Sequence, residues 1–220
     1  MKVCTDACLF GAWVAHKASN KELQIDRILD IGTGTGLLSL MLAQKVKATI
    51  GAIEIDDDAA QQAQSNFNQT KYKDRLHVVH QDIRTYHPGT LYDLIISNPP
   101  FFENNLKSED QQRNLALHSP SLTLSELIVA VKKLLSQTGM FAILLPYFRA
   151  EAFITLAAKH DLLLQQQVLV QQTESHQFFR SMLLFSLQQV EATTSTIMIK
   201  KERSYSNEFS ELLKDYYLFL

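Results

Sequence analysis

Four consecutive residues, Asn98-Pro99-Pro100-Phe101, have the types and the spacing to do chemistry on an amino group. Neither proline can continue a strand, and together they stiffen the turn so that the Asn98 side chain and the Pro99 carbonyl point in fixed directions. Those two oxygens are acceptors for the two hydrogens of one NH2 group. The ring of Phe101 can stack on a planar base or amide. We therefore predict Asn98, Pro99, Pro100 and Phe101 to be the catalytic residues.

A second candidate site lies between Ile28 and Gly36, where three of the seven glycines fall within five residues. The glycines Gly32, Gly34 and Gly36 follow an apolar run and precede a segment of helix-forming composition. Without a Cβ atom, such a loop can adopt backbone angles closed to other residues and let a ligand approach the helix N-terminus. This arrangement predicts a nucleotide-type pocket, although a glycine-rich turn alone can also be a tight strand-to-helix connection.

The glycine spacing distinguishes this loop from a dinucleotide site. A dinucleotide fingerprint has G-x-G-x-x-G and an acid about 20 residues later, whereas here the spacing is G-x-G-x-G and the later acid is Glu54. With Asp30 before it, the loop resembles motif I of the class I S-adenosylmethionine methyltransferases. The resemblance implies S-adenosyl-L-methionine as cofactor, with the loop under its amino-acid part and Glu54 at its ribose. The cofactor-binding residues expected from these two stretches are Asp30, Gly32, Thr33, Gly34, Gly36, Glu54, Ile55 and Asn98.

The two stretches together suggest methyl transfer to an amine. The exocyclic amine of adenine is a poor nucleophile because its lone pair is delocalised into the ring. Two acceptors that bend the amine out of the ring plane would localise that lone pair, and a methyl sulfonium held in line at about 3 to 3.5 Å would complete the attack. The pairing resembles the amino-methylating class I enzymes, which act on adenine N6, guanine N2, cytosine N4 or the side-chain amide of glutamine.

Alternating apolar and helix-forming segments predict a Rossmann-like α/β fold with a doubly wound, mostly parallel, seven-stranded sheet and a C-terminal antiparallel hairpin. The expected strands are 25–31, 48–55, 76–80, 91–97, 140–145, 168–171 and 181–188, followed by an extended segment at 196–200. The expected helices are one within 1–19, then 37–44, 56–69, 119–137, 147–160 and 207–220. Thr5 or Asp6 would cap the first of them. The helix at 119–137 would begin at Ser121 or at Thr123-x-x-Glu126 and end before Gly139. Because ligands bind outside the carboxyl ends of such strands, the two candidate sites should meet at one edge.

Length and composition suit one domain, residues 1–220, with the segments 1–22 and 190–220 packed on it. The net charge of −2 shows no overall basic field of the kind expected for non-specific binding of nucleic acid. Cys4 and Cys8 are the only cysteines and make neither a disulfide framework nor a four-ligand zinc site. No apolar run approaches the ~18 residues of a membrane span. We expect a cytoplasmic monomer without a metal ion and without membrane contact.

A narrower resemblance covers nearly the whole chain. It is carried by Met1 to Asp6, Gly11-Ala12-Trp13, the Ile31 to Gly36 loop, Ser97 to Phe102, Lys107-Ser108, Arg113, Ala116, His118, Tyr205-Ser206 and Tyr216-Tyr217-Leu218. These stretches are similar to the tRNA1(Val) adenine-37 N6-methyltransferase family, with departures at Cys4 and Leu117. The resemblance implies a tRNA substrate, methylated at an unpaired adenine of the anticodon loop. It implies that Asp82 and Ile83 line the adenine of the cofactor, and that Phe101, Phe102, Lys107, Arg113 and His118 bind the substrate.

Three other functions stay open at this point. A glutamine N5-methyltransferase would offer the same NH2 group, but such enzymes usually carry a helical domain before the glycine loop, and only 27 residues precede Ile28 here. A guanine-N2 rRNA methyltransferase and a non-enzymatic RNA-binding or assembly factor that keeps the cofactor are the others. Phosphate contacts could come from three basic clusters, Lys71 with Lys73 and Arg75, Lys132 with Lys133, and Lys200 with Lys201 and Arg203.

Overall fold

The structure, a computed structural model, describes residues 4–20, 22–100, 122–202 and 204–219. Its first half contains α1 (Thr5–Ala18), β1 (Arg27–Ile31), α2 (Leu37–Lys45), β2 (Thr49–Glu54), α3 (Asp57–Asn68), β3 (Leu76–His80) and β4 (Tyr92–Ser97). Two short 3-10 helices, η1 (Lys73–Arg75) and η2 (Ile83–Thr85), flank β3. The second half contains α5 (Leu124–Leu134), β5 (Leu135–Pro146), α6 (Tyr147–Ala158), β6 (Leu163–Gln171), β7 (Phe178–Ser186), β8 (Thr193–Met198), β9 (Lys200–Lys201), β10 (Ser204–Tyr205) and α7 (Asn207–Leu213).

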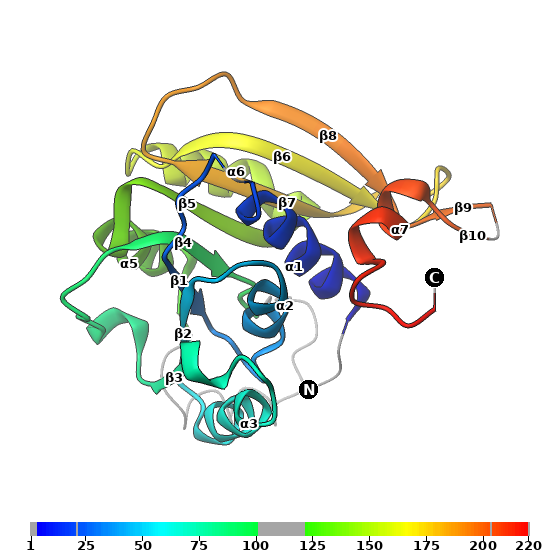
Figure 1. Cartoon of the computed structure of the whole chain (residues 1–220). Helices are drawn as coiled ribbons and strands as arrows, with labels where there is room; N and C mark the ends of the chain where they lie inside the picture. Colours follow the sequence, from blue (N-terminus) through cyan, green and yellow to red (C-terminus); the bar gives the residue numbers. More distant parts are fainter. Residues whose placement is uncertain (1–3, 21, 101–121, 203, 220) are drawn as a thin grey trace, which may run out of the picture.

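One large sheet forms the centre of the molecule, with the strand order β3-β2-β1-β4-β5-β7-β6-β8 (Figure 1). The strands from β3 to β5 are parallel, and β7 is antiparallel to both of its neighbours. The predicted parallel sheet with a C-terminal antiparallel hairpin is therefore confirmed. The expected number of seven strands is too low, because β8 pairs in parallel with β6 and makes the sheet eight-stranded.

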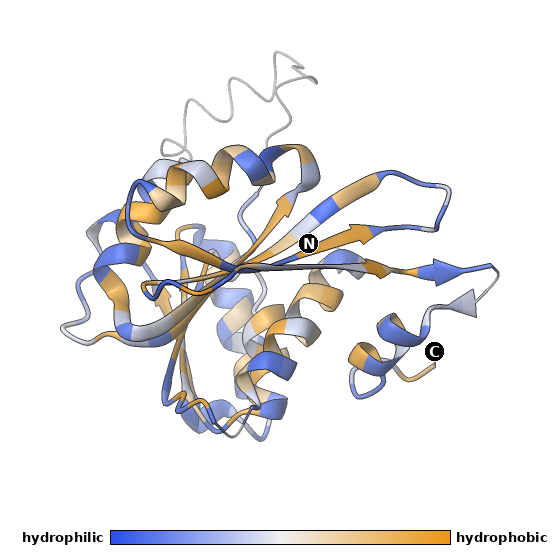
Figure 2. Cartoon of the chain, turned by 90° about the horizontal axis from the view of Figure 1, so that it is seen from above, coloured by the Kyte–Doolittle hydropathy of each residue, from blue (hydrophilic) through white to orange (hydrophobic). Residues whose placement is uncertain are grey.

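Helices cover both faces of this sheet, as Figure 2 shows in a view along the layers. Successive residues of a strand point to opposite faces. Ile28 belongs to the core that also holds residues of α1, α2, α3 and α7, whereas Leu29 belongs to the core that holds residues of α5 and α6. Both faces of the central strands are apolar, which agrees with a parallel sheet that is covered on both sides. The two cores hold β1, β2 and β4 from either side and thereby fix where their carboxyl ends lie.

The expected helix at 119–137 differs from the observed one at its end. α5 begins at the cap Thr123, whose hydroxyl accepts from the Glu126 amide at 3.2 Å while the Glu126 carboxylate accepts from the Thr123 amide at 2.8 Å. It ends at Leu134, and β5 follows at once with Leu135 paired to Tyr92. The expectation that Gly139 lies just past a helix is wrong, because Gly139 belongs to β5.

The N-terminal and C-terminal segments pack on each other and on the same face of the sheet. The N-cap of α1 is Cys4, not Thr5 or Asp6 as expected, and no side chain caps this helix. In the C-terminal part, α7 packs on α1, with Phe209 and Leu213 fully buried. None of the described helices combines the length and the apolar character that a membrane crossing requires.

Candidate active site

The predicted cofactor loop and the predicted catalytic turn meet between β1 and β4, where the strand order reverses direction. β1 pairs with β2 on one side and with β4 on the other, and Ile31 lies opposite Ser97 at the carboxyl ends. The Ser97 hydroxyl donates to the Ile31 carbonyl at 2.9 Å, and both residues are buried. The glycine loop that follows Ile31 and the turn that follows Ser97 are thus fixed side by side, at the point where doubly wound sheets bind ligands.

The glycine loop adopts a conformation that its sequence makes possible. Gly32, Gly34 and Gly36 have φ angles of 69°, 57° and 85°, in the left-handed region that favours glycine. At Gly36 an added Cβ would overlap the ring of Phe67, whereas at the exposed Gly32 it would point into open space. Gly32 and Thr33 donate their amides to the Ile53 carbonyl at 2.9 and 3.1 Å. The loop is therefore closed on its inner side and open at Gly32.

Asp30 lies beneath this loop and does not reach the surface. Its Oδ2 atom accepts from the Thr33 hydroxyl at 2.6 Å and from the Ser39 hydroxyl at 2.8 Å. Its Oδ1 atom is buried without a hydrogen-bond partner among the described residues. Burial raises the pKa of Asp30 to about 6, against the hydrogen bonds that favour the charged form. The predicted cofactor residues Asp30 and Thr33 are thus both buried, and the carboxylate holds the two ends of the loop together.

Glu54 at the end of β2 reaches across to the same loop. Its Oε2 atom accepts from the Gly34 amide at 2.8 Å, and its Oε1 atom accepts from the amides of Ile55 and Asp56 at 2.9 and 3.1 Å. The half-buried carboxylate is therefore held at the carboxyl edge beside the open side of the loop. This is the place where the sequence predicts an acid for a ribose. The neighbouring Ile55 is exposed there, and the Asp56 side chain caps α3 by accepting from the Ala59 amide.

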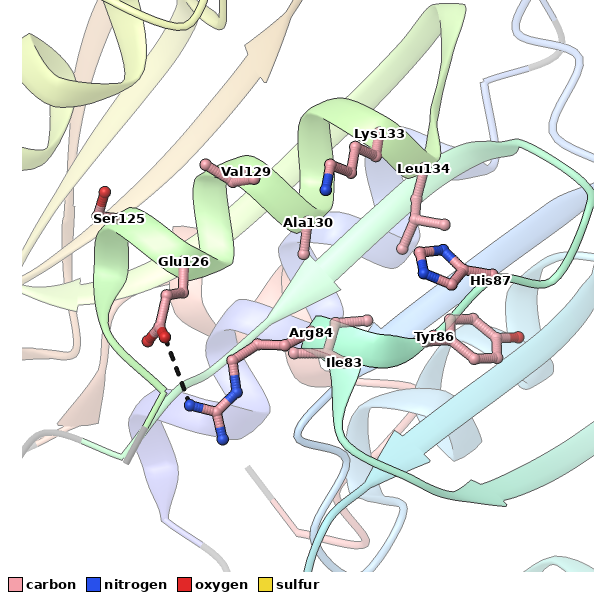
Figure 3. Close-up of a pocket in the computed structure, with 10 residues that line it drawn as sticks. All are labelled: Ile83, Arg84, Tyr86, His87, Ser125, Glu126, Val129, Ala130, Lys133 and Leu134. Atoms are coloured by element: carbon pink, nitrogen blue, oxygen red, sulfur yellow. Dashed lines mark hydrogen bonds and ion pairs between the residues drawn. The ribbon is translucent and has the colours of Figure 1, made fainter. Parts of the chain in front are cut away.

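Asp82, at the end of the next strand, is held by an arginine that the sequence analysis did not select. The Arg84 Nε atom donates to both carboxylate oxygens at 3.0 and 2.9 Å, and this pairing lowers the pKa of Asp82. The other side of the Arg84 guanidinium lies 3.4 Å from the Glu126 carboxylate of α5 (Figure 3). Asp82 and the buried Ile83 are thus attached to α5, and both lie at the same sheet edge as Glu54.

A groove of about 290 Å³ runs between η2 and α5 (Figure 3). Its walls carry both charges and aromatic rings, from Ile83, Arg84, Tyr86, His87, Ser125, Glu126, Val129, Ala130, Lys133 and Leu134. Neither the glycine loop nor Asn98 contributes to it. The groove shares Ile83 with the predicted cofactor residues and otherwise lies beside that site.

The predicted catalytic turn is described as far as Pro100. Asn98 is half-buried, Pro99 is buried and Pro100 is exposed. Within the described ranges no residue hydrogen-bonds the Asn98 side chain. The remaining predicted residues, Phe101, Phe102, Lys107, Arg113 and His118, lie outside the described residues.

Comparison with known proteins agrees with this geometry. The family model described as "Methyltransferase small domain" matches residues 13–145. The tRNA1(Val) (adenine(37)-N6)-methyltransferase of Aliivibrio salmonicida is 40% identical over 219 residues, which cover 99% of this chain and 91% of that protein. The protein of the same name from Bacteroides fragilis is 38% identical over 222 residues, with coverage of 99% and 91%.

Solved structures share the fold at low sequence identity. A predicted O-methyltransferase from Agrobacterium tumefaciens superposes with a TM-score of 0.72 at 13% identity, covering 94% of this chain and 95% of that one. The glycopeptide N-methyltransferase MtfA superposes with a TM-score of 0.59 at 10% identity, covering 81% and 94%. These likenesses support the Rossmann-like fold, and the full-length sequence relatives narrow the assignment. The chain belongs to the tRNA1(Val) (adenine(37)-N6)-methyltransferase family.

Proposed function

We propose that the protein transfers a methyl group from S-adenosyl-L-methionine to the N6 amine of adenine 37 in the anticodon loop of tRNA1(Val). The observation that carries this proposal is the junction of the glycine loop and the Asn98-Pro99 turn, bridged by the hydrogen bond from Ser97 to Ile31. It lays the predicted cofactor loop beside the predicted amine acceptors at one edge, in a chain whose full-length relatives bear this name.

The residues present fit the cofactor. The exposed Gly32 leaves open space where any other residue would place a Cβ, and the Glu54 carboxylate is held beside it. Asp82 and Ile83 lie at the same edge, where they would bind the adenine of the cofactor. When bound, S-adenosyl-L-methionine supplies a methyl group on a sulfonium, which an amine nitrogen can displace. Asp30, below the surface, shapes the loop through Thr33 and Ser39.

Asn98 and Pro99 would bind the amine to be methylated. The Asn98 amide oxygen and the Pro99 carbonyl each accept one hydrogen of the NH2 group. Holding both hydrogens turns the nitrogen lone pair out of the base plane, toward the cofactor side of the site. An adenine in an anticodon loop is already unpaired, so bringing it into the site costs less than flipping a base from a duplex.

The test is methyl transfer from labelled S-adenosyl-L-methionine to tRNA that lacks its own N6-methyladenosine, followed by nucleoside mass spectrometry. Wild type should produce N6-methyladenosine, and Asn98→Ala should lower the rate by about 100-fold or more, as does loss of other preorganised polar groups. Asn68→Ala, an exposed residue at the end of α3, is the matched control and should keep full activity. Label in rRNA guanine or in a glutamine-bearing protein, with none in tRNA, would contradict the proposal.

The other expectations about this enzyme stay predictions. We expect it to act as a monomer, in the cytoplasm and without a metal ion. The part of the chain covered by the structure contains no group of three or more His, Cys, Asp or Glu residues that could hold a metal. Light scattering of the purified protein, and activity after treatment with a chelator, would test the first and the last of these expectations.

A further inference from the structure

Two of the three basic clusters lie far from the catalytic turn. Lys71 and Lys73 are in and before η1, which leads into the first residue of β3. Lys132 and Lys133 are in the last turn of α5, which leads directly into β5. Since β3, β4 and β5 are parallel, both clusters lie at the amino edge of the sheet, opposite to Asn98. A substrate bound at Asn98 approaches from the other edge.

Lys200 and Lys201 of the third cluster lie at the catalytic edge, and its third member, Arg203, lies outside the described residues. β8 is parallel to β6 and runs in the same direction as β5, so the lysines that follow β8 lie at the carboxyl edge. The Lys200 amide donates to the Gln172 carbonyl at 2.9 Å, just beyond the end of β6. Lys201 then pairs with Ser204 in the short β9–β10 hairpin, which extends past the tip of β8 (Figure 1). Both lysines are exposed.

Aromatic rings accompany these lysines. The Lys200 ammonium lies 5.8 Å from the ring centroid of Tyr205, which is 37% exposed. Tyr205 in turn stacks on the buried Phe209, with centroids 4.7 Å apart and planes at 17°. The hairpin therefore presents a cation and an aromatic ring on a support that is anchored in the core.

The start of α6 adds a second aromatic group at the same edge. Phe148 is 69% exposed and Tyr147 is 43% exposed, directly after Pro146 at the end of β5. The Arg149 guanidinium lies 5.8 Å from the Phe148 centroid, and Tyr147 packs against Phe178 at 5.5 Å. A phenylalanine this exposed gains little from the fold, whereas an aromatic ring beside a cation is a common platform for unpaired bases.

We propose that RNA docks on the surface formed by the first turn of α6 and the β9–β10 hairpin, with a base stacked on Phe148 and phosphates bound by Lys200 and Lys201. This inference rests on the proposed function and names the surface on which its tRNA lies. The strands that lead into the two groups, β5 and β8, are three strand spacings apart in the sheet, or about 14 Å, a span that a single RNA arm covers.

At the carboxyl edge of the sheet, the distribution of charges favours RNA binding on the half that carries α6 and the β9–β10 hairpin. The opposite half, after β2, carries the exposed residues Asp56, Asp57 and Asp58, which repel phosphates. The proposed surface also carries two acids, Glu174 and Glu202, in the loops beside the lysines. RNA is therefore bound there by stacking and by a few individual phosphate contacts, which predicts a weak dependence of affinity on salt.

The first test compares two pairs of exposed lysines. Lys200→Ala with Lys201→Ala should weaken tRNA binding and lower the slope of log affinity against log salt concentration by about 2, one for each lost phosphate contact. Lys71→Ala with Lys73→Ala changes the net charge equally at the amino edge, and should leave affinity and slope unchanged. The affinity for S-adenosyl-L-methionine, measured by calorimetry, should be the same in all three proteins and shows that they are folded.

The second test concerns stacking. Phe148→Ala should raise the tRNA dissociation constant by about 5- to 100-fold, which corresponds to the usual contribution of one stacked base, whereas Phe148→Tyr keeps a ring and should bind as wild type does. If the Lys71/Lys73 double variant loses tRNA binding and the Lys200/Lys201 double variant keeps it, the proposed docking surface is wrong. Methyl transfer by wild type would still support the proposed function in that case. Wild type that binds tRNA and methylates none would refute the proposed function alone, and wild type that binds no tRNA would refute both.

Discussion

The carboxylate of Asp30 is a charge in the interior of the protein. Its exposed fraction is 0%, and two hydroxyl donors, Thr33 and Ser39, share one of its oxygens. Burial raises the pKa of Asp30 from 3.8 to about 6, because the ionised form loses its hydration. Between pH 4 and pH 6 the folded state consequently binds more protons at this residue than the unfolded state does. The contribution of Asp30 to stability therefore falls as the pH rises through this window.

Substitution of Asp30 by asparagine should remove this pH dependence. Ionisation of Asp30 costs the folded state about 3 kcal/mol more than it costs the unfolded state. In the asparagine variant this cost is absent, and the amide oxygen can still accept from Thr33 and Ser39. We expect the melting temperature of Asp30→Asn, minus that of wild type, to increase between pH 4.5 and pH 7.5. Other titrating groups are common to both proteins and cancel in the difference. A difference that stays constant over this range would show that Asp30 is ionised throughout.

The candidate site could be predicted only as far as its residues follow local patterns. Gly32, Asp82 and Asn98 each come after an apolar strand and Glu54 ends one, and the carboxyl ends of parallel strands meet at one edge. The ion pair between Asp6 and Arg180, at 2.7 Å, joins residues that are 174 positions apart in the sequence, so no local pattern predicts it. Ser97 and Ser39 could have been noticed as small hydroxyl residues inside apolar segments, a pattern that often marks a buried hydrogen bond.

At the scale of elements, the turn from β1 to α2 depends on a glycine for two separate reasons. Gly36 has a φ of 85°, which strains any residue with a Cβ, and that Cβ would also overlap Phe67 of α3. Gly89 has a φ of 68° but open space around it, so a substitution there causes the backbone strain without the steric overlap. The two positions therefore form a matched pair.

Alanine at these two glycines should have unequal effects. Gly89→Ala should lower the free energy of unfolding by about 1 to 2 kcal/mol, the cost of a left-handed conformation. Gly36→Ala should lose a further 1 to 3 kcal/mol from the overlap with Phe67, and should also weaken S-adenosyl-L-methionine binding because the loop shifts. Urea denaturation and calorimetry measure the two effects. Equal losses of stability would mean that Phe67 moves aside without cost.

The boundaries of elements were predictable where composition changes sharply. The apolar run at 76–80 predicts a strand, and β3 (Leu76–His80) confirms these bounds. The sequence does not predict the boundary between α5 and β5, because the helical pattern continues past Leu134 without a break and Gly139 has the position of a helix stop. In the structure a Cβ at Gly139 would lie 2.9 Å from the Tyr92 carbonyl, next to a register shift between β4 and β5. That glycine serves close packing of two strands, which only the tertiary structure shows.

At the scale of the whole molecule, the C-terminal segment is tied to the glycine loop through two helices. Phe209 of α7 is fully buried against α1, and α1 packs on α2, the helix that the glycine loop begins. The Tyr216 hydroxyl donates to the Met41 carbonyl of α2 at 3.1 Å, and Lys45 pairs with Asp215. These contacts support the prediction that residues 1–220 form a single domain in which the C-terminal extension and the site unfold together.

Phe209→Ala should therefore destabilise the whole protein and not only its C-terminus. Removing a buried phenylalanine side chain costs about 3 to 5 kcal/mol, which in a chain of this length lowers the melting temperature by roughly 10 °C. Phe219→Ala is the matched control, since Phe219 is 89% exposed and its removal should change nothing. In scanning calorimetry we expect one transition for each protein. A small early transition in Phe209→Ala, with the main one unmoved, would mean that α7 is a separate unit and that the site does not depend on it.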